Sequence, residues 1–330
     1  MDAVTSLPSL AEIEATAARI APYVVATPTL RWRDPFVEEV LGDGALHLKF
    51  EFLQKTGTFK ARGAANNLLS LSAEERKRGV TAFSAGNHAI AVSYAAGALG
   101  VSAKVVMHKA ANPARLAAAR SYGAEVVLGE NIAEAFTLVN RIREEERRSF
   151  VHPFEGERTL LGTATVGLEI ARAVPKLDAA LVAVGGGGLI GGVGAALKQL
   201  QPDCEVIGVE PVGAQGLTRS LALGRPLEKV EVETIADSMG PPLHTPYTFG
   251  ICKQVVDRMV LVDDDALCRA IALAFQRLKL AVEPACVATL AALAGPLKGQ
   301  LAGKRVLALL CGSNIDAATY ARYLERGLAA

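Results

Sequence analysis

The sequence predicts an α/β fold built from two open, twisted, mostly parallel sheets that are flanked by helices. Short apolar segments alternate with helical segments of about 10–15 residues along almost the whole chain, which is typical of strand–helix–strand units. The alternation forms two series, one on each side of residue 150. With 330 residues, 51% of them hydrophobic, the chain is long enough for two domains with separate cores.

The first series follows an N-terminal helix and an early strand. The helix begins at a capping box formed by Ser9 and Glu12, and the alternating segment 46–50 is predicted to be a strand. Further strands are predicted at 80–84, 103–107, 125–128 and 150–152. Helices are predicted between them at 89–99, 113–122 and 132–148. We therefore expect residues 53–150 to form a small, mobile domain.

The second series fills the C-terminal half of the chain. Strands are predicted at 180–184, 205–209, 258–262 and 305–310. Helices are predicted from the glycine run at 185–188 to residue 200, at 264–278 and at 284–293. We expect residues 1–52 and 151–330 to form the large domain, with a cleft between the two domains.

The composition excludes several classes of partner. The formal net charge is +1, so no strongly basic face is expected for nucleic acid or an anionic membrane. No apolar run is long enough to predict a membrane span. The five cysteines form no CxxC pair, which favours free thiols in a reducing, cytoplasmic setting. The five histidines show no zinc-ligand spacing.

Four consecutive glycines, Gly185 to Gly188, follow a predicted strand and open a helix. Backbone N–H groups at a helix start, together with the helix dipole, favour a bound phosphate. Gly186, Gly188 and Gly191 also satisfy the G-x-G-x-x-G pattern, and Glu210 ends the following strand. Taken alone, this pattern would support a nicotinamide-dependent dehydrogenase, which is an alternative from another reaction class.

Lys60 is predicted to lie in the first turn of a helix, with Thr58 as its N-cap. The helix dipole disfavours a cation at this position and therefore lowers the pKa of the amine. A neutral amine is the nucleophile that Schiff-base chemistry needs.

The segment from Ser84 to His88 lies between a predicted strand and a helix. Small residues at a helix start favour an anion such as a carboxylate, and the amide of Asn87 can bind a phenolic or carbonyl oxygen. His88 is more often a packing histidine than a base. A lysine suited to imine formation, a phosphate-binding loop and a carboxylate-binding loop are together what a pyridoxal phosphate site requires.

The chain resembles the fold-type II pyridoxal phosphate enzymes, which have the tryptophan synthase β-like fold, and within them the threonine/serine dehydratase and serine racemase group. The matching stretches are TFKARGA (58–64), SAGNHA (84–89), HPF (152–154), VGLEI (166–170), GGGGLIGG (185–192), VIGVEP (206–211), TIAD (234–237) and CGSNID (311–316). They occur in the family's order and cover nearly the whole chain.

The resemblance implies a role for each matched residue. Lys60 is the catalytic residue, which forms the Schiff base and later moves the α-proton. Cofactor binding is implied for Phe59, Lys60, Asn87, Gly185, Gly186, Gly187, Gly188, Leu189, Glu283 and Cys311. Binding of the substrate carboxylate is implied for Ser84, Ala85, Gly86, Asn87 and His88.

The implied activity is β-elimination from a β-hydroxy amino acid, which yields a 2-oxo acid and ammonia. Candidate substrates are L-threonine, L-serine, a phenylserine and 3-hydroxyaspartate, and Ser238, where the family usually has glycine, suggests a substrate other than threonine. Racemisation, β-replacement and a catalytically silent binding protein remain alternatives. The resemblance also implies a catabolic enzyme without a C-terminal regulatory domain, assembled as a homodimer or homotetramer.

A cation site is a further expectation from the resemblance. Family members that bind a divalent ion use a glutamate, a backbone carbonyl and an aspartate, which correspond here to Glu210, Ala214 and Gly216. Because glycine replaces the carboxylate, Mg²⁺ or Ca²⁺ should bind poorly. A monovalent cation such as K⁺ is the remaining hypothesis.

Ala85 leads to a prediction about racemisation. Similar racemases carry a second serine at this position, where it acts as the base on the opposite face of the cofactor. Alanine has no proton to exchange, so elimination should dominate in this chain. We expect Ala85→Ser to increase formation of the opposite enantiomer, measured as solvent deuterium at Cα by NMR. An unchanged deuterium signal would contradict the implied loop geometry.

Overall fold

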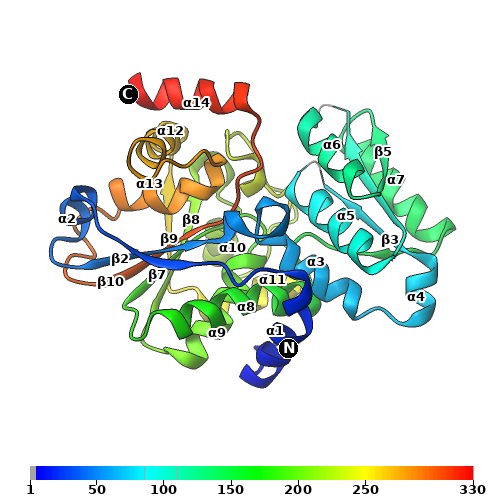
Figure 1. Ribbon diagram of the computed structural model, residues 1–330, viewed down its shortest axis with the longest axis horizontal. Coiled ribbons are helices and arrows are strands. Elements are labelled where there is room, and N and C mark those ends of the chain that lie inside the picture. Colours follow the sequence, from blue (N-terminus) through cyan, green and yellow to red (C-terminus); the bar gives the residue numbers. More distant parts are fainter. Residues whose placement is uncertain (1–4, 85, 110, 330) are drawn as a thin grey trace.

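The protein contains two sheets, one larger and one smaller, each flanked by helices (Figure 1). The computed structural model describes residues 5–84, 86–109 and 111–329. The larger sheet has six strands in the order β1-β2-β10-β7-β8-β9, and the smaller has four in the order β5-β4-β3-β6. The predicted α/β class with mainly parallel sheets is therefore confirmed.

The larger sheet draws its strands from both ends of the chain. They are β1 (Thr29–Trp32), β2 (Ala45–Phe50), β7 (Ala179–Ala183), β8 (Glu205–Pro211), β9 (Arg258–Val262) and β10 (Arg305–Leu310). Only the edge strand β1 is antiparallel to its neighbour, and the register between the central strands β7 and β8 pairs Ala179 with Glu205. Strand β7 is buried along its whole length, which explains why it reads as a continuous apolar run.

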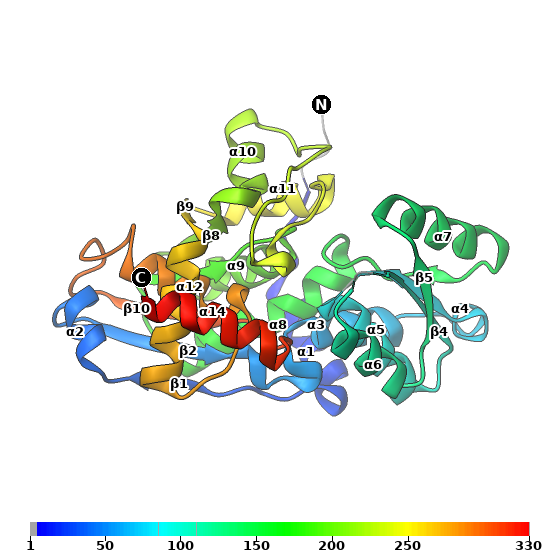
Figure 2. The same cartoon turned by 90° about the horizontal axis from the view of Figure 1, so that it is seen from above.

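The smaller sheet comes from one continuous stretch of chain. Its strands are β3 (Val80–Phe83), β4 (Ala103–His108), β5 (Glu125–Gly129) and β6 (Ser149–Phe150), and all are parallel. Its helices are α4 (Ala73–Arg78), α5 (Asn87–Leu99), α6 (Pro113–Ser121) and α7 (Ile132–Glu145). Figure 2 shows this sheet and its helices as a separate lobe beside the larger sheet.

The remaining helices surround the larger sheet or join the two lobes. They are α1 (Leu10–Ile20), α2 (Pro35–Leu41), α3 (Lys60–Leu69), α8 (Glu157–Ala173), α9 (Gly188–Leu200), α10 (Gly216–Leu223), α11 (Pro246–Val255), α12 (Asp264–Leu273), α13 (Ala288–Ala294) and α14 (Ala317–Ala329). The two sheets have separate cores, one around β7 and β10 and one around β3, β4 and α5. Within the described part of the chain, no helix combines the length and the apolar content needed to cross a membrane.

Three local predictions need correction. The helix predicted over 264–278 ends as an α-helix at Leu273 and continues as a π-helix over Ala274–Leu278. The helix predicted over 284–293 begins with a 3-10 turn at Pro284–Val287. Thr58 has extended backbone angles before α3, but its buried hydroxyl has no hydrogen-bond partner, so it does not cap the helix.

A buried ionic cluster fixes α3 against β2 and α8. The Arg62 guanidinium donates to Glu51 Oε1 at 2.8 Å and to Glu169 Oε1 at 2.7 Å. Lys49 Nζ donates to Glu169 Oε2 at 2.5 Å and to the Thr27 carbonyl at 2.7 Å. Lys49, Glu51 and Arg62 are all fully buried. Each charge has a partner, so the cluster avoids the large cost of an isolated buried ion.

Arg62→Met tests the weight of this cluster. The substitution leaves Glu51 as a buried carboxylate without its guanidinium, so we expect the free energy of unfolding to fall by about 3–5 kcal/mol. Urea unfolding followed by circular dichroism measures the change. The matched control is Arg172→Met, because Arg172 pairs with Glu14 on the surface and its loss should cost less than about 1 kcal/mol. An equal loss of unfolding free energy in the two variants would show that the buried ion pairs stabilise the protein no more than a surface pair does.

Candidate active site

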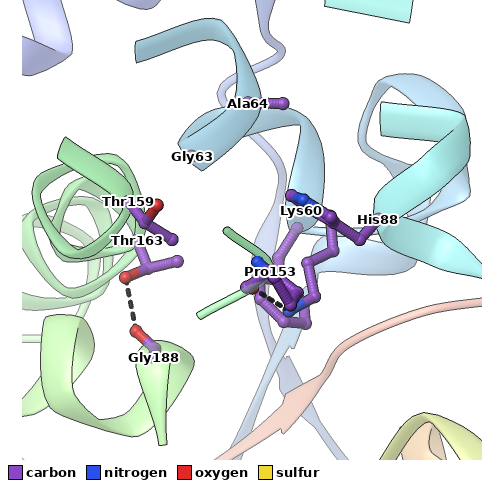
Figure 3. Close-up of a pocket in the computed structure, with 9 residues that line it drawn as sticks. Lys60, Gly63, Ala64, His88, Pro153, Thr159, Thr163 and Gly188 are labelled. Carbon is purple, nitrogen blue, oxygen red and sulfur yellow. Dashed lines mark hydrogen bonds between the residues drawn. The ribbon is translucent and has the colours of Figure 1, made fainter. Parts of the chain in front are cut away.

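Lys60 is the first residue of α3 and lies on the wall of a cavity between the two lobes. A β-bridge between Thr58 and Gly312 and a hydrogen bond from Phe59 N to the Cys311 carbonyl at 3.3 Å hold the chain before α3 against the end of β10. Lys60 Nζ donates to the Pro153 carbonyl at 2.6 Å. Figure 3 shows the Lys60 side chain beside Pro153 and His88. The predicted first-turn position of Lys60 is therefore confirmed.

The ammonium form of Lys60 loses its proton more readily than that of an ordinary lysine. Desolvation by the surrounding protein lowers the pKa of Lys60 to about 8, although Cys311 and Glu283 oppose the shift. Its side chain remains partly accessible because it faces the cavity. A substantial fraction of this amine is therefore neutral near physiological pH, as nucleophilic attack on a carbonyl requires.

Steric contact with Phe154 explains two of the four glycines. A Cβ on Gly186 would lie 2.2 Å from Phe154 Cδ1, and a Cβ on Gly188 would lie 2.8 Å from the Phe154 carbonyl oxygen. Gly187 has φ +86°, a conformation that favours glycine. Thr163 Oγ1 donates to the Gly188 carbonyl at 2.6 Å, as Figure 3 shows. Close packing and turn geometry thus both require this sequence.

The same loop forms an anion-binding helix start. Helix α9 begins at Gly188 and has Gly187 as its N-cap residue. The first N–H groups of a helix have no partner within the helix, and the dipole places partial positive charge there. Gly185 to Leu189 all line the cavity that contains Lys60. A phosphate group is the ligand that this arrangement favours.

Asn87 links the smaller lobe to the C-terminal part of the chain at the cavity wall. Its Nδ2 donates to Glu283 Oε1 at 2.8 Å, and its Oδ1 accepts from Asn314 Nδ2 at 2.8 Å. Asn314 also donates to the Thr56 carbonyl at 2.8 Å. Asn87 begins α5, whereas Glu283 and Asn314 belong to the C-terminal part of the chain. The Asn87 amide is therefore held firmly at the cavity wall.

Two acidic groups near Lys60 are held in their protonated forms or close to them. Burial raises the pKa of Glu283 to about 7, and Arg115 and Asn87 oppose that shift. Burial, with Cys286 and Glu283 nearby, raises the pKa of Cys311 well above its ordinary value. The Cys311 thiol is therefore neutral, so it offers no negative charge to a ring nitrogen placed beside it.

The two histidines near Lys60 are neutral packing residues. His88 Nε2 lies 2.8 Å from the Val151 carbonyl, and burial with Lys60 nearby lowers the pKa of His88 to about 3. His152 Nδ1 accepts from Glu155 N at 2.9 Å, and burial lowers the pKa of His152 to about 4. This agrees with the expectation that His88 is a packing residue and not a base.

Arg115 lies between the two lobes, close to Glu283 on the cavity wall. It belongs to α6, and its Nη1 pairs with Asp237 Oδ2 at 2.5 Å. Its Nη2 donates to the Asn314 carbonyl at 3.0 Å and lies 3.9 Å from Glu283 Oε2. Nearby, Asn112 Nδ2 donates to Asp316 Oδ2 at 2.6 Å. These contacts hold the smaller lobe against the larger one above the site.

The structure brings most of the predicted cofactor residues to one cavity. They are Phe59, Lys60, Asn87, Gly185, Gly186, Gly187, Gly188, Leu189, Glu283 and Cys311. The same cavity is lined by Phe154, Ala183, Ser238, Met239 and Ala285, to which the sequence analysis gave no role in the cofactor site. Of the predicted carboxylate loop, Ser84 Oγ accepts from Gly86 N at 3.2 Å, and Ala85 lies outside the described residues. The ligand roles of all these residues remain predictions.

The Glu210 carboxylate is already bound to the start of α10. Its side chain is fully buried and accepts hydrogen bonds from Leu217 N at 2.7 Å, Thr218 N at 2.9 Å and Thr218 Oγ1 at 2.6 Å. Burial raises the pKa of Glu210 to about 7, and these hydrogen bonds oppose the shift. Glu210 therefore binds the start of α10 and is not available to a ribose, which removes the support for a dehydrogenase.

The donor set of the cavity fits pyridoxal phosphate. Lys60 supplies the amine, the start of α9 supplies the anion site, and Asn87 supplies an amide at the wall between them. Cys311 and Phe59 line the same space as a neutral thiol and an apolar ring. These groups suit the aldehyde, the phosphate, the ring hydroxyl and the flat heterocycle of that cofactor.

Comparisons with known proteins agree with this chemistry. A family model described as pyridoxal-phosphate dependent enzyme matches residues 20–312. The chain is 53% identical to a phenylserine dehydratase from Ralstonia pickettii, over 98% of both chains. It is 40% identical to an L-threonine ammonia-lyase from Thermotoga maritima, over 88% of this chain and 72% of that protein.

Solved structures show the same relationship. The structure of maize serine racemase superposes with a TM-score of 0.89 and 31% identity, covering 98% of this chain and 99% of the other. The structure of a serine racemase from Dictyostelium discoideum superposes with a TM-score of 0.86 and 34% identity, covering 94% of this chain and 100% of the other. The chain therefore belongs to the pyridoxal-phosphate-dependent enzymes, and within them to the threonine dehydratase-like lyases that eliminate the β-hydroxyl of hydroxy amino acids.

Proposed function

We propose that the preferred substrate is a β-hydroxy amino acid with an aromatic side chain, such as phenylserine. The observation that carries this proposal is the 53% identity to a phenylserine dehydratase over 98% of both chains, against 40% over 72% of a threonine ammonia-lyase. Met239, on the cavity wall beside Ser238, supports it because an apolar thioether packs well against an aromatic ring.

The cofactor is pyridoxal phosphate, and we propose that Lys60, Asn87, Cys311 and residues 185–189 hold it. When bound, it withdraws electrons from the substrate and so makes the Cα proton acidic. The lowered pKa of Lys60 suits this residue to take that proton as a neutral amine. The neutral Cys311 thiol leaves the ring nitrogen without a charged partner. That arrangement favours prompt loss of a β-substituent over a long-lived carbanion.

The leaving hydroxyl needs a proton, because it departs as water. Among the described residues that line the cavity, Lys60 and Glu283 have pKa values of about 8 and about 7. They are therefore the protein groups best matched to exchange a proton near neutral pH. Lys60 carries the abstracted proton and Glu283 keeps the Asn87 amide in place, so we assign the transfer to Lys60.

We further propose that residues 53–150 close over the substrate. Arg115 and Asn112 of the smaller lobe meet Asp237 and Asp316 of the larger one, and all four residues line a hollow distinct from the Lys60 cavity. The Asp237 carboxylate is 60% exposed, so its pairing with Arg115 can open and close at low cost. In the closed arrangement these contacts exclude water from the site.

The setting of the enzyme also belongs to this proposal. All five cysteines are free and buried, which supports a reducing, cytoplasmic location. The role in amino-acid catabolism and the homodimeric or homotetrameric state rest on the family resemblance alone. The hypothesis of a bound K⁺ ion has little support, because Glu210 already accepts three hydrogen bonds.

A substrate panel tests the proposed function. Phenylserine, threonine, serine and 3-hydroxyaspartate are each incubated with the holoenzyme, and ammonia and the 2-oxo acid are measured. We expect phenylserine to give the highest kcat/KM and Lys60→Ala to abolish all turnover while the circular dichroism spectrum is retained. A higher kcat/KM for threonine or serine would overturn the aromatic preference, and activity in Lys60→Ala would overturn the assignment of the lysine.

The lowered pKa of Lys60 predicts how the apoprotein takes up its cofactor. The attacking species is the neutral amine, so the uptake rate should rise as the pH increases and level off above about 8. The measurement is the growth of the yellow absorbance after pyridoxal phosphate is added to apoprotein over a range of pH on both sides of that value. Nα-acetyl-lysine is the control, and its rate should keep rising toward its ordinary pKa. Parallel profiles would show that burial does not change the Lys60 amine.

A further inference from the structure

The His244 ring packs directly against the backbone of Gly216, in the space that a side chain at residue 216 would need. A Cβ on Gly216, at the start of α10, would lie 2.4 Å from His244 Nε2 and 2.8 Å from His244 Cδ2. The side chain of Val230 closes the same space, with Cγ2 3.0 Å from that Cβ. No side chain fits at residue 216 while His244 keeps this position. The glycine and the histidine are therefore a matched pair.

His244 is held in place although one of its nitrogens has no partner. The residue is 5% exposed, and its backbone N–H donates to the Leu227 carbonyl at 2.8 Å. A second backbone bond, from Val230 N to the Pro242 carbonyl at 2.7 Å, ties the same two segments together. His244 Nε2 is buried and has no hydrogen-bond partner. The imidazole therefore packs against the Gly216 backbone as a space-filling group.

The groups around this pair do not form a metal site. The two Glu210 oxygens accept three hydrogen bonds from Leu217 and Thr218, at the start of α10. Residue 216 has no carboxylate, and the described residues contain no group of three or more His, Cys, Asp or Glu side chains placed to hold a metal. A divalent cation prefers several oxygen ligands, and those are lacking here.

The segment that ends at His244 carries part of the active-site wall. Asp237 pairs with Arg115 of the smaller lobe, and Ser238 and Met239 line the cavity. Beyond His244, Glu155 accepts hydrogen bonds from Tyr247 N and Thr248 N, both at 3.0 Å. Two anchors thus hold the C-terminal end of the wall segment, namely the packing of His244 against Gly216 and the Glu155 bonds just beyond it.

We infer that this enzyme holds no metal ion at the position marked by Glu210, Ala214 and Gly216, and that the His244 imidazole fills the space that a carboxylate side chain at residue 216 would need. We further infer that the packed imidazole fixes the wall segment 237–244. His244 is a positioning residue, because it acts on the substrate through Ser238 and Met239. The absence of an ion is independent of the proposed function, whereas the effect on KM rests on it.

The first experiment needs no substrate. Holoenzyme is exchanged into Tris buffer without metal salts, and its metal content is measured by inductively coupled plasma mass spectrometry. We expect far less than one ion per chain and a Tm that is the same with EDTA, Mg²⁺, Ca²⁺, and KCl or NaCl at equal ionic strength. An ion present at one per chain, or a specific rise in Tm with one of these cations, would overturn the inference.

The second experiment uses a double-mutant cycle with phenylserine, or with the best substrate of the panel. Gly216→Ala displaces the imidazole and His244→Ala removes it, so each should raise KM several-fold with a smaller change in kcat. The double variant should be less impaired than the product of the single effects, because its new methyl group meets no ring. Independent, multiplicative effects would overturn the proposed pair.

His47→Ala is the matched control for the cycle. His47 is a partly buried histidine on β2 that also has an unpartnered buried nitrogen, and it lines a separate surface hollow with Arg31 and Arg305. The substitution should change Tm without changing KM. Added imidazole should partly restore the KM of His244→Ala and not alter His47→Ala. If His244→Ala fails to fold, Gly216→Ala and the metal analysis still decide the inference.

Discussion

The position of Lys60 depends on the buried ionic cluster below it. Arg62 stands two residues after Lys60 on α3, and its guanidinium is fixed by Glu51 and Glu169. Lys49 completes the charge balance from β2. Since a buried ion without its partner is very unfavourable, these ion pairs favour the observed position of α3 relative to β2 and α8. Ion pairing, in addition to apolar packing, therefore positions the amine of Lys60 at the cavity.

Much of the fold and of the cofactor site could be predicted because the signals are local. Alternating strands and helices predict the α/β class. In the glycine run, Gly186 and Gly188 leave room for Phe154, and Gly187 adopts a positive φ. The first-turn position of Lys60 was predicted correctly, although the Thr58 cap from which it was inferred does not form. Predictions failed where side-chain context decides, as at Thr58, whose hydroxyl is buried without a partner and does not cap the helix.

The contacts between the two lobes and the packing of His244 could not be predicted in the same way. Arg115 is an ordinary basic residue of a short helix, and only the meeting of the two lobes gives it Asp237 as a partner. His244 carries no local signal, and its contact with Gly216 joins a loop to the start of α10, which comes earlier in the chain. Such contacts arise from tertiary packing, which a single sequence without a template does not encode in any short pattern.

The peptide from His152 to Phe154 serves both ends of the cofactor site. The Pro153 carbonyl accepts a hydrogen bond from Lys60 Nζ, and the Phe154 ring packs directly against Gly186. A shift of this peptide would therefore move the reactive nitrogen and the anion pocket together. The amine and the anion site therefore share one supporting peptide, so a substitution that displaces it would disturb both.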